Sequence, residues 1–233
     1  MPFTLSHAVL APPISYLTGN RLPVAALAIG SMVPDLHRLF SHTNSNITHL
    51  WSSLIHPDLW IGLAFCAVWY LIYRPVIYRF IGIQHDLKIH NILSALKFIL
   101  VMCLALIIGT ATHLIWDGLT HVDFRTFAFH DFLAQQFQLF GNSYPLHRIL
   151  QIGTSVIVLP FILWMSLHYF KTHQQYLAVS LKIKSFAWGL LLFSIFTVSR
   201  PEISLHLKRL ILWNINENNE LNVHNVTIAL PLK

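Results

Sequence analysis

The chain has 233 residues, of which 55% are hydrophobic and only 10% are charged, and its mean hydropathy is +0.58. A soluble domain carries roughly 25% charged residues, so this composition excludes a soluble protein whose surface mostly faces water. The formal net charge of +6 comes from basic residues scattered singly between apolar runs. This distribution excludes the basic stripe of a nucleic-acid-binding protein and is typical of membrane-flanking loops.

The N-terminal region is apolar but interrupted. Its first twenty residues lack a basic segment and contain three prolines, so we expect no signal peptide. Leu22 to Val33 is apolar yet broken by proline and glycine. We expect a buried or re-entrant helix here rather than a complete membrane span.

Four later segments approach the length of about 20 apolar residues that crosses a bilayer as a helix. They are residues 59–77, 92–116, 149–169 and 186–198. The sequence therefore predicts an all-α fold, a polytopic helical membrane protein with four to five hydrophobic helices. We expect residues 1–200 to form a single helical membrane domain, and residues 201–233 to form an interfacial helix and a polar tail.

The charges of the loops predict an orientation. Seven basic residues lie in or next to the loops between the first and second spans and between the third and fourth, five in the loops and Arg74 and Lys97 near the span ends. The opposite side carries four, namely Arg21, Arg38, Arg125 and Arg148. The positive-inside rule places the richer loops in the cytoplasm. Because successive spans are antiparallel, polar residues before the first span meet those at the end of the second, on the other face.

Histidine is unusually frequent and supplies the candidate chemistry. Fifteen histidines accompany six aspartates and three glutamates, and the glutamates all lie beyond residue 200. His113 and Asp117, at the end of the second span, share one helix face at a spacing that can hold one metal ion. An ionisable pair in a hydrophobic span is costly and therefore a functional candidate. A His–Asp hydrogen bond that anchors the helix end explains the pair equally well.

Three further residues are expected on the same membrane face. Asp35 follows the apolar N-terminal segment, and His7 and His49 lie in short polar stretches before the first span. Taken singly, Asp35 is explained by a helix end or turn, and each histidine by ordinary packing. Taken with His113 and Asp117, they are ligands of the type that Zn²⁺ binds. His49 lies fourteen residues after Asp35, which allows the chain to fold back.

The chain resembles a known family through an ordered set of motifs. They are MPFTLSH, LPVAALAIGSMVPD, a histidine nine residues before DLWIGL, and GTATHLIWDGLTH. The set resembles domain-of-unknown-function family 4184 over at least residues 1–160. That family is similar to a group of bacterial inner-membrane proteins described as metal-dependent hydrolases. The resemblance therefore implies a multi-pass protein of the bacterial inner membrane.

The same order of residues resembles the metal site and helical fold of zinc-dependent phospholipase C. The resemblance implies one zinc ion held by Asp35, His49, His113 and Asp117. It implies a second ion held by His7 and bridged by Asp117. No histidine of this chain has a glutamate four residues later, so the further zinc ligands of those enzymes have no counterpart. We therefore expect one or two ions of zinc or another divalent metal.

Residues after the second span are candidates for supporting roles. His121, Asp123 and Arg125 follow the predicted ligands and could orient them or bind an anionic substrate. A polar loop at the membrane interface explains these three residues more simply. Asp58 matches a recurring aspartate of the family, and helix capping explains it equally well.

These features together predict a membrane-embedded metal-dependent hydrolase that acts on a phosphoester or lipid-like substrate at the membrane surface. Asp35 and Asp117 are the expected catalytic carboxylates, because the membrane region has no glutamate to accept a proton. The expected partners are membrane lipids and an amphiphilic substrate. The main alternative is a non-enzymatic membrane protein with a structural or sensing metal site. Haem binding and transport are weaker alternatives, since carboxylates suit a hard metal and no inverted repeat is evident.

Overall fold

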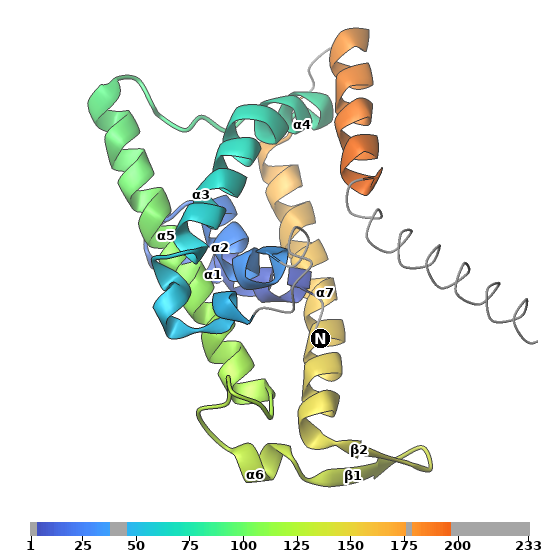
Figure 1. The fold of residues 1–233 in the computed structure, drawn as a ribbon. Coiled ribbons are helices and arrows are strands. Elements are labelled where there is room, and N and C mark those ends of the chain that lie inside the picture. The colour runs from blue at the N-terminus through green and yellow to red at the C-terminus, as the bar shows by residue number, and fades with distance from the viewer. Residues whose placement is uncertain (1–3, 38–45, 176–178, 197–233) are drawn as a thin grey trace, which may run out of the picture. The chain divides into compact units, whose positions relative to one another are not determined.

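A computed structural model describes residues 4–37, 46–175 and 179–196, and helices dominate it (Figure 1). The N-terminal part contains η1 (Thr4–Leu10), α1 (Ala11–Leu17), α2 (Val24–Leu36), η3 (Ile47–His49) and η4 (Trp51–Leu54). The middle contains α3 (Asp58–Val68), η5 (Trp69–Tyr73), α4 (Arg74–Ile81) and α5 (Ile92–Thr120). It is followed by α6 (His130–Leu133), β1 (Gln136–Leu139), β2 (Asn142–Pro145) and α7 (Leu146–His173).

The chain divides into two compact units, Met1–Lys184 and Ser185–Lys233. All the elements named above lie in the first unit. In the second unit, the described residues 185–196 are helical. The domain boundary predicted near residue 200 and the predicted interfacial helix lie outside the described residues, so both stay predictions.

Three helical segments are long and apolar enough to cross a membrane. They are Asp58–Ile81, Ile92–Thr120 and Leu146–His173, of 24, 29 and 28 residues. They contain the first three predicted spans and extend further than predicted at one or both ends. The fourth predicted span overlaps a helix over residues 181–196, which is shorter than the other three, and its last two residues lie outside the described part of the chain.

Local signals in the sequence explain where two of these segments begin and end. The Asn91 side chain accepts a hydrogen bond from the backbone N–H of Ser94, which caps the first turn of α5. Gly82 ends α4 with a left-handed backbone (φ 73°), a conformation that glycine adopts without strain. Between α3 and α4 the helix widens into the π-helical turn η5. Such turns lie inside α-helices and are frequent at functional sites.

Helix α2 is the buried helix predicted near the N-terminus, and it crosses α5 at two glycines. A Cβ atom on Gly30 would lie 2.4 Å from the carbonyl oxygen of Leu106, and one on Gly109 would lie 2.3 Å from that of Leu27. Only glycine at both positions allows this backbone contact. Thr110 Oγ1 donates to the Gly30 carbonyl at 3.1 Å and fixes the helices along their axes.

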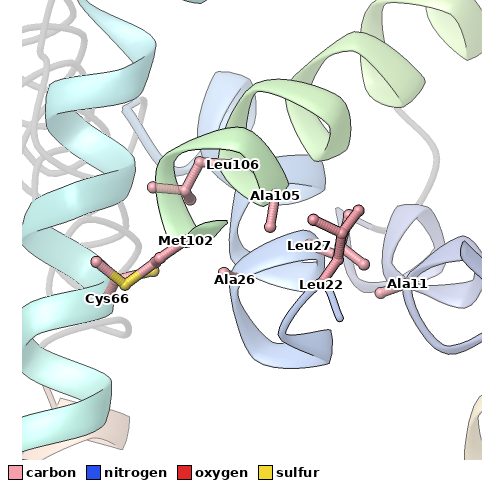
Figure 2. Close-up of a cluster of buried hydrophobic side chains, with 8 residues drawn as sticks. All are labelled: Ala11, Leu22, Ala26, Leu27, Cys66, Met102, Ala105 and Leu106. Carbon is pink, nitrogen blue, oxygen red and sulfur yellow. The ribbon is translucent and has the colours of Figure 1, made fainter. Parts of the chain in front are cut away.

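The apolar core lies around this crossing. It joins residues from α1, α2, α3, α5 and the connection between α1 and α2, namely Ala11, Leu22, Ala26, Leu27, Cys66, Met102, Ala105 and Leu106 (Figure 2). Small alanines lie beside larger side chains, which lets the helices approach closely. Both cysteines of the chain are free, as expected from their apolar surroundings.

The segment between α5 and α7 departs from the all-α prediction. Strands β1 and β2 pair antiparallel, with Leu139 opposite Asn142. Phe140 and Gly141 form the two-residue turn, and both have positive φ, as a tight hairpin requires. Every residue of β1 is exposed, and its polar–apolar alternation covers only the four residues Gln136–Leu139, which is too short a signal to predict a strand.

Candidate metal centre

The structure brings all five predicted metal ligands together in the first unit. His7 lies in η1, Asp35 in the last turn of α2, and His49 in η3. The C-terminal part of α5 carries His113 and Asp117. Four segments that are separate in the sequence therefore supply one buried cluster.

Their side chains converge on a small volume. Nε2 of His113 lies 3.5 Å from Oδ2 of Asp117, one helical turn away. Nε2 of His49 lies 3.4 Å from Oδ1 of Asp35 and 3.8 Å from Oδ2 of Asp117. The ring of His7 stacks on that of His113 with centroids 4.0 Å apart. His113 and Asp117 are only 1% and 2% exposed.

These separations suit a shared cation better than direct hydrogen bonds. They exceed the roughly 2.7–3.2 Å of an N–H···O bond, whereas two ligands at about 2.0–2.1 Å from a tetrahedral zinc ion are roughly 3.3 Å apart. Within the described residues, Nε2 of His7, His49 and His113 are all buried without a hydrogen-bond partner. A buried polar atom without a partner is costly. A cation bound in either group of ligands that the cluster forms would satisfy two of the three nitrogens.

The crossing of α2 and α5 sets the orientation of His113. Its Nδ1 lies 2.8 Å from the carbonyl oxygen of Ser31, the residue after Gly30. When Nδ1 donates to this carbonyl, Nε2 keeps its lone pair and faces the cluster. The backbone contact at Gly30 and Gly109 thus holds a metal-binding tautomer in place.

Two threonines form hydrogen bonds that position His49 and Asp35, and no motif in the sequence predicts this role. Thr48 Oγ1 donates to the Pro34 carbonyl at 2.9 Å, which ties the segment carrying His49 to the end of α2. Thr4 Oγ1 donates to Oδ2 of Asp35 at 2.9 Å. Their only signal in the sequence is their place near the predicted ligands, which does not reveal a hydrogen bond.

The ligands form two overlapping groups. Ligand atoms of His7, Asp35 and His113 lie within 4.8 Å of one another, and so do those of His49, His113 and Asp117. The residue common to both groups is His113. A bridging role for Asp117 toward an ion on His7, which the family resemblance implied, stays a prediction. The shared imidazole favours one ion over two, because a single nitrogen binds a single ion.

The electrostatics of the cluster favour a cation. Burial, and then the neighbouring His113, lower the pKa of His7 to about 4, so its ring is neutral near pH 7. Burial opposes ionisation of Asp35, but its contacts with His49, His113 and Thr4 outweigh burial and lower its pKa to about 2. A neutral imidazole and an ionised carboxylate are the forms that bind metal.

The three predicted supporting residues differ in their contacts. Arg125 NH1 donates to Oδ2 of Asp117 at 2.8 Å, and Arg125 Nε donates to Oδ1 of Asp123 at 2.9 Å. Nδ1 of His121 lies 3.5 Å from Oδ1 of Asp117 and 3.1 Å from the backbone oxygen of the same residue. Arg125 and His121 therefore contact the metal-ligand cluster directly. Asp123 contacts Arg125 and is linked to the cluster only through that residue.

Asp58 has a buried position that helix capping does not explain. It is the first residue of α3, and the N-cap position belongs to Pro57. Instead its Oδ2 accepts a hydrogen bond from Ser53 Oγ at 2.6 Å, while its buried Oδ1 has no partner among the described residues. The bond holds the end of η4 against the start of α3.

The fold and the cluster define a mostly helical protein with three candidate membrane spans and a buried group of histidines and aspartates that could hold a metal ion. The chain belongs to the family described as Domain of unknown function (DUF4184), whose model matches residues 1–229. No curated protein and no solved structure matches it. The resemblance to the family is thus confirmed, whereas those to metal-dependent hydrolases and phospholipase C stay predictions.

Proposed function

We propose that this protein is a metal-dependent hydrolase embedded in the bacterial inner membrane, with one divalent cation, foremost zinc, in the His/Asp cluster. The observation that carries the proposal is the convergence of three buried imidazole nitrogens without hydrogen-bond partners on two carboxylates. Histidines and a carboxylate are the ligand set of many catalytic zinc sites. The family match assigns no activity, so the proposal rests on this geometry and on the motifs.

The residues of the cluster would divide the work between them. His49, His113 and Asp117 would hold the ion, because their ligand atoms form one compact group. When bound, such an ion supplies Lewis acidity and lowers the pKa of water to about 7. Asp35, whose Oδ1 lies 3.4 Å from Nε2 of His49, would complete the ligand set and would also act as the proton acceptor. His7 stacks on His113 and would keep that ring in place.

An apolar cavity beside the cluster supports an amphiphilic substrate. It measures about 190 Å³ and is lined by His7 and by residues of η1, α5 and α7, among them Leu10, Trp116 and Val158. Two of its walls are candidate membrane spans, so the molecules that reach it in a bilayer are lipids. One hydrocarbon chain in this cavity would bring the attached ester close to His7.

Arg125 supports an anionic substrate. Its guanidinium reaches Asp117 at the edge of the cluster and is partly exposed. Arginine binds phosphate through two parallel hydrogen bonds. A lipid phosphoester has both a hydrocarbon chain, which fits the apolar cavity, and an anionic group, which fits beside Arg125.

A second candidate function is a structural or sensing metal site without turnover. The observation that favours it is the nearly complete burial of the cluster. Four protein ligands around one ion would leave no open coordination position, which is typical of structural sites. Metal content alone does not separate the two candidates, but turnover does.

The first experiment is metal analysis by mass spectrometry of the detergent-purified chain, prepared without chelators. We expect about one zinc or other divalent ion per chain in the wild type. His113→Ala and Asp35→Ala should lose it, whereas His90→Ala, a change of an exposed histidine, should retain it. A wild-type protein free of metal would sink both candidate functions.

The second experiment tests turnover by the metal-loaded protein on a short-chain phosphatidic acid and on bis(4-nitrophenyl) phosphate. We expect hydrolysis that stops with a chelator and in Asp35→Asn, because the proposed proton acceptor is then neutral. Retention of the metal with no hydrolysis of any phosphoester would leave the structural or sensing function.

A further inference from the structure

A second and larger cavity lies at the other end of the spans. It measures about 560 Å³ and is enclosed by α1, the start of α2, η5 with α4, and the end of α7. Arg74 and Tyr78 of α4 line it together with Tyr169 and His173 of α7, and the hydroxyls of Tyr78 and Tyr169 lie 3.3 Å apart. The metal ligands on helices lie at the other end of α2 and in the C-terminal part of α5, and the two sites share no residue.

The polar wall of this cavity is a connected set of donors around Arg74. Arg74 NH2 donates to the carbonyl oxygen of His85, and its guanidinium lies over the ring of Tyr78, 4.7 Å from the centroid. Nδ1 of His85 is 2.7 Å from the hydroxyl of Tyr169, and the Tyr169 ring stacks on His173 at 4.2 Å. The arginine is therefore held in place by the protein before any ligand binds.

The charge of this wall is positive. Arg74 lines the cavity together with three histidines, and no aspartate or glutamate is among the described residues that line it. Burial, and then the neighbouring Arg74, lower the pKa of His85, as expected for an imidazole beside a fixed positive charge. An anion would relieve this repulsion, and a cation would increase it.

The rest of the lining is largely apolar and aromatic. It includes Trp69, Tyr70 and Trp164, with Leu22 and Met165. The Nε1 atom of Trp69 is buried without a hydrogen-bond partner in the described part of the chain. Tryptophan and tyrosine are enriched where the hydrocarbon of a bilayer meets its headgroups. The lining thus combines a cationic residue with apolar surface.

Its position fits the same boundary. The first and third candidate spans end at Ile81 and His173, so Arg74 and Tyr169 lie within about two turns of the membrane surface. The loop after the first span carries basic residues, and the positive-inside rule assigns this face to the cytoplasm, where anionic lipids gather.

We propose that this cavity binds the anionic headgroup of a membrane phospholipid. Arg74 would bind the phosphate, with Tyr169 and His85 as neighbouring donors. The upper part of an acyl chain would lie against Trp69 and Trp164. The proposal does not depend on the metal centre or on hydrolysis. It describes a binding site, at which no bond of the lipid is broken.

The test is a tryptophan-fluorescence titration of the detergent-purified full chain with dihexanoyl-phosphatidylglycerol, dihexanoyl-phosphatidylcholine and inorganic phosphate. We expect phosphatidylglycerol to bind at least tenfold more tightly than the other two ligands. Arg74→Gln should remove that preference. Arg79→Gln should retain it, because Arg79 is exposed on the same helix and does not line this cavity.

Three results would overturn the proposal. They are equal binding of phosphatidylcholine, an equal loss in Arg79→Gln, and displacement of phosphatidylglycerol by inorganic phosphate at similar concentration, which would assign the site to free phosphate. If Arg74→Gln does not fold, the salt dependence of binding by the wild type tests the proposal instead. Its binding of phosphatidylglycerol should weaken as the salt concentration rises, and binding indifferent to salt would count against an anion site.

Discussion

The cluster around His113 and the cavity around Arg74 are both polar sites among hydrophobic helices, yet their atoms are arranged in opposite ways. In the cluster, three imidazole nitrogens have no hydrogen-bond partner among the described residues and lie close to two carboxylates. Around the cavity, arginine, histidine and tyrosine bond to one another, and the described lining has no carboxylate. The unpartnered imidazole lone pairs and the carboxylates of the cluster favour binding of a cation. The hydrogen-bond donors around the cavity, with no carboxylate beside them in the described lining, favour binding of an anion.

The difference also lies in how each site is held. The ligands of the cluster are fixed from behind by backbone carbonyls and threonines, and they depend on the crossing of α2 and α5. The donors of the cavity are fixed by one another, across α4 and α7. Variants that damage one set of contacts should therefore leave the other site intact.

The largest effect is expected from Gly109→Ala, which should disrupt the fold itself. The added Cβ would lie 2.3 Å from the carbonyl oxygen of Leu27, and an overpacked backbone contact costs about 3 kcal/mol or more. The melting temperature of the variant in detergent measures this loss of stability. Gly153→Ala is the matched control, because a Cβ there meets nothing within 4 Å. Equal melting temperatures for the two variants would contradict the close crossing.

The next effect separates the two sites. Asp117→Asn should weaken binding of the divalent ion by a factor of about 100 or more, since even outer residues of metal sites contribute about 10- to 100-fold. It should leave phosphatidylglycerol binding within about twofold of wild type. Arg74→Gln should do the reverse. Metal titration measures ion affinity, and the fluorescence assay measures phosphatidylglycerol affinity. Asp131→Asn, a change of an exposed aspartate, is the control. Loss of both functions in either variant would show that the sites are coupled.

The smallest effect is expected from Thr4→Ala, which removes the hydrogen bond to Oδ2 of Asp35. Metal affinity should fall about tenfold, the lower end of what such outer partners contribute. Thr4→Ser keeps the hydroxyl and should restore affinity to within about threefold of wild type. If serine and alanine behave alike, the threonine acts through packing and not through its hydrogen bond.

The sequence was informative wherever a signal was local. The three long apolar runs predicted the spans, and the spacing of His113 and Asp117 predicted their shared helix face, which the structure has. The meeting of His7, Asp35 and His49 with that face followed from antiparallel spans and from family motifs. Whether the five bind metal stays a prediction.

Other features depend on contacts between distant segments, and no local pattern reports them. The Ser31 carbonyl that orients His113 belongs to a residue 82 positions away. The cavity around Arg74 requires α1, α4 and α7 to meet, and its residues lie far apart in the chain. Asp58 was ambiguous for a different reason: its sequence position suits a helix cap, whereas its actual partner is Ser53.

The placement of the proposed ligands on α2 and α5 has a thermodynamic consequence. An ion held by Asp35 and His113 joins two helices that otherwise meet through a contact of bare backbone at Gly30 and Gly109. Ion binding and helix association are then linked, and each strengthens the other by the same free energy. Above the dissociation constant, every tenfold rise in free ion would add about 1.4 kcal/mol to the stability of the folded chain. The supply of metal in the surrounding compartment would then set how much folded protein the membrane contains.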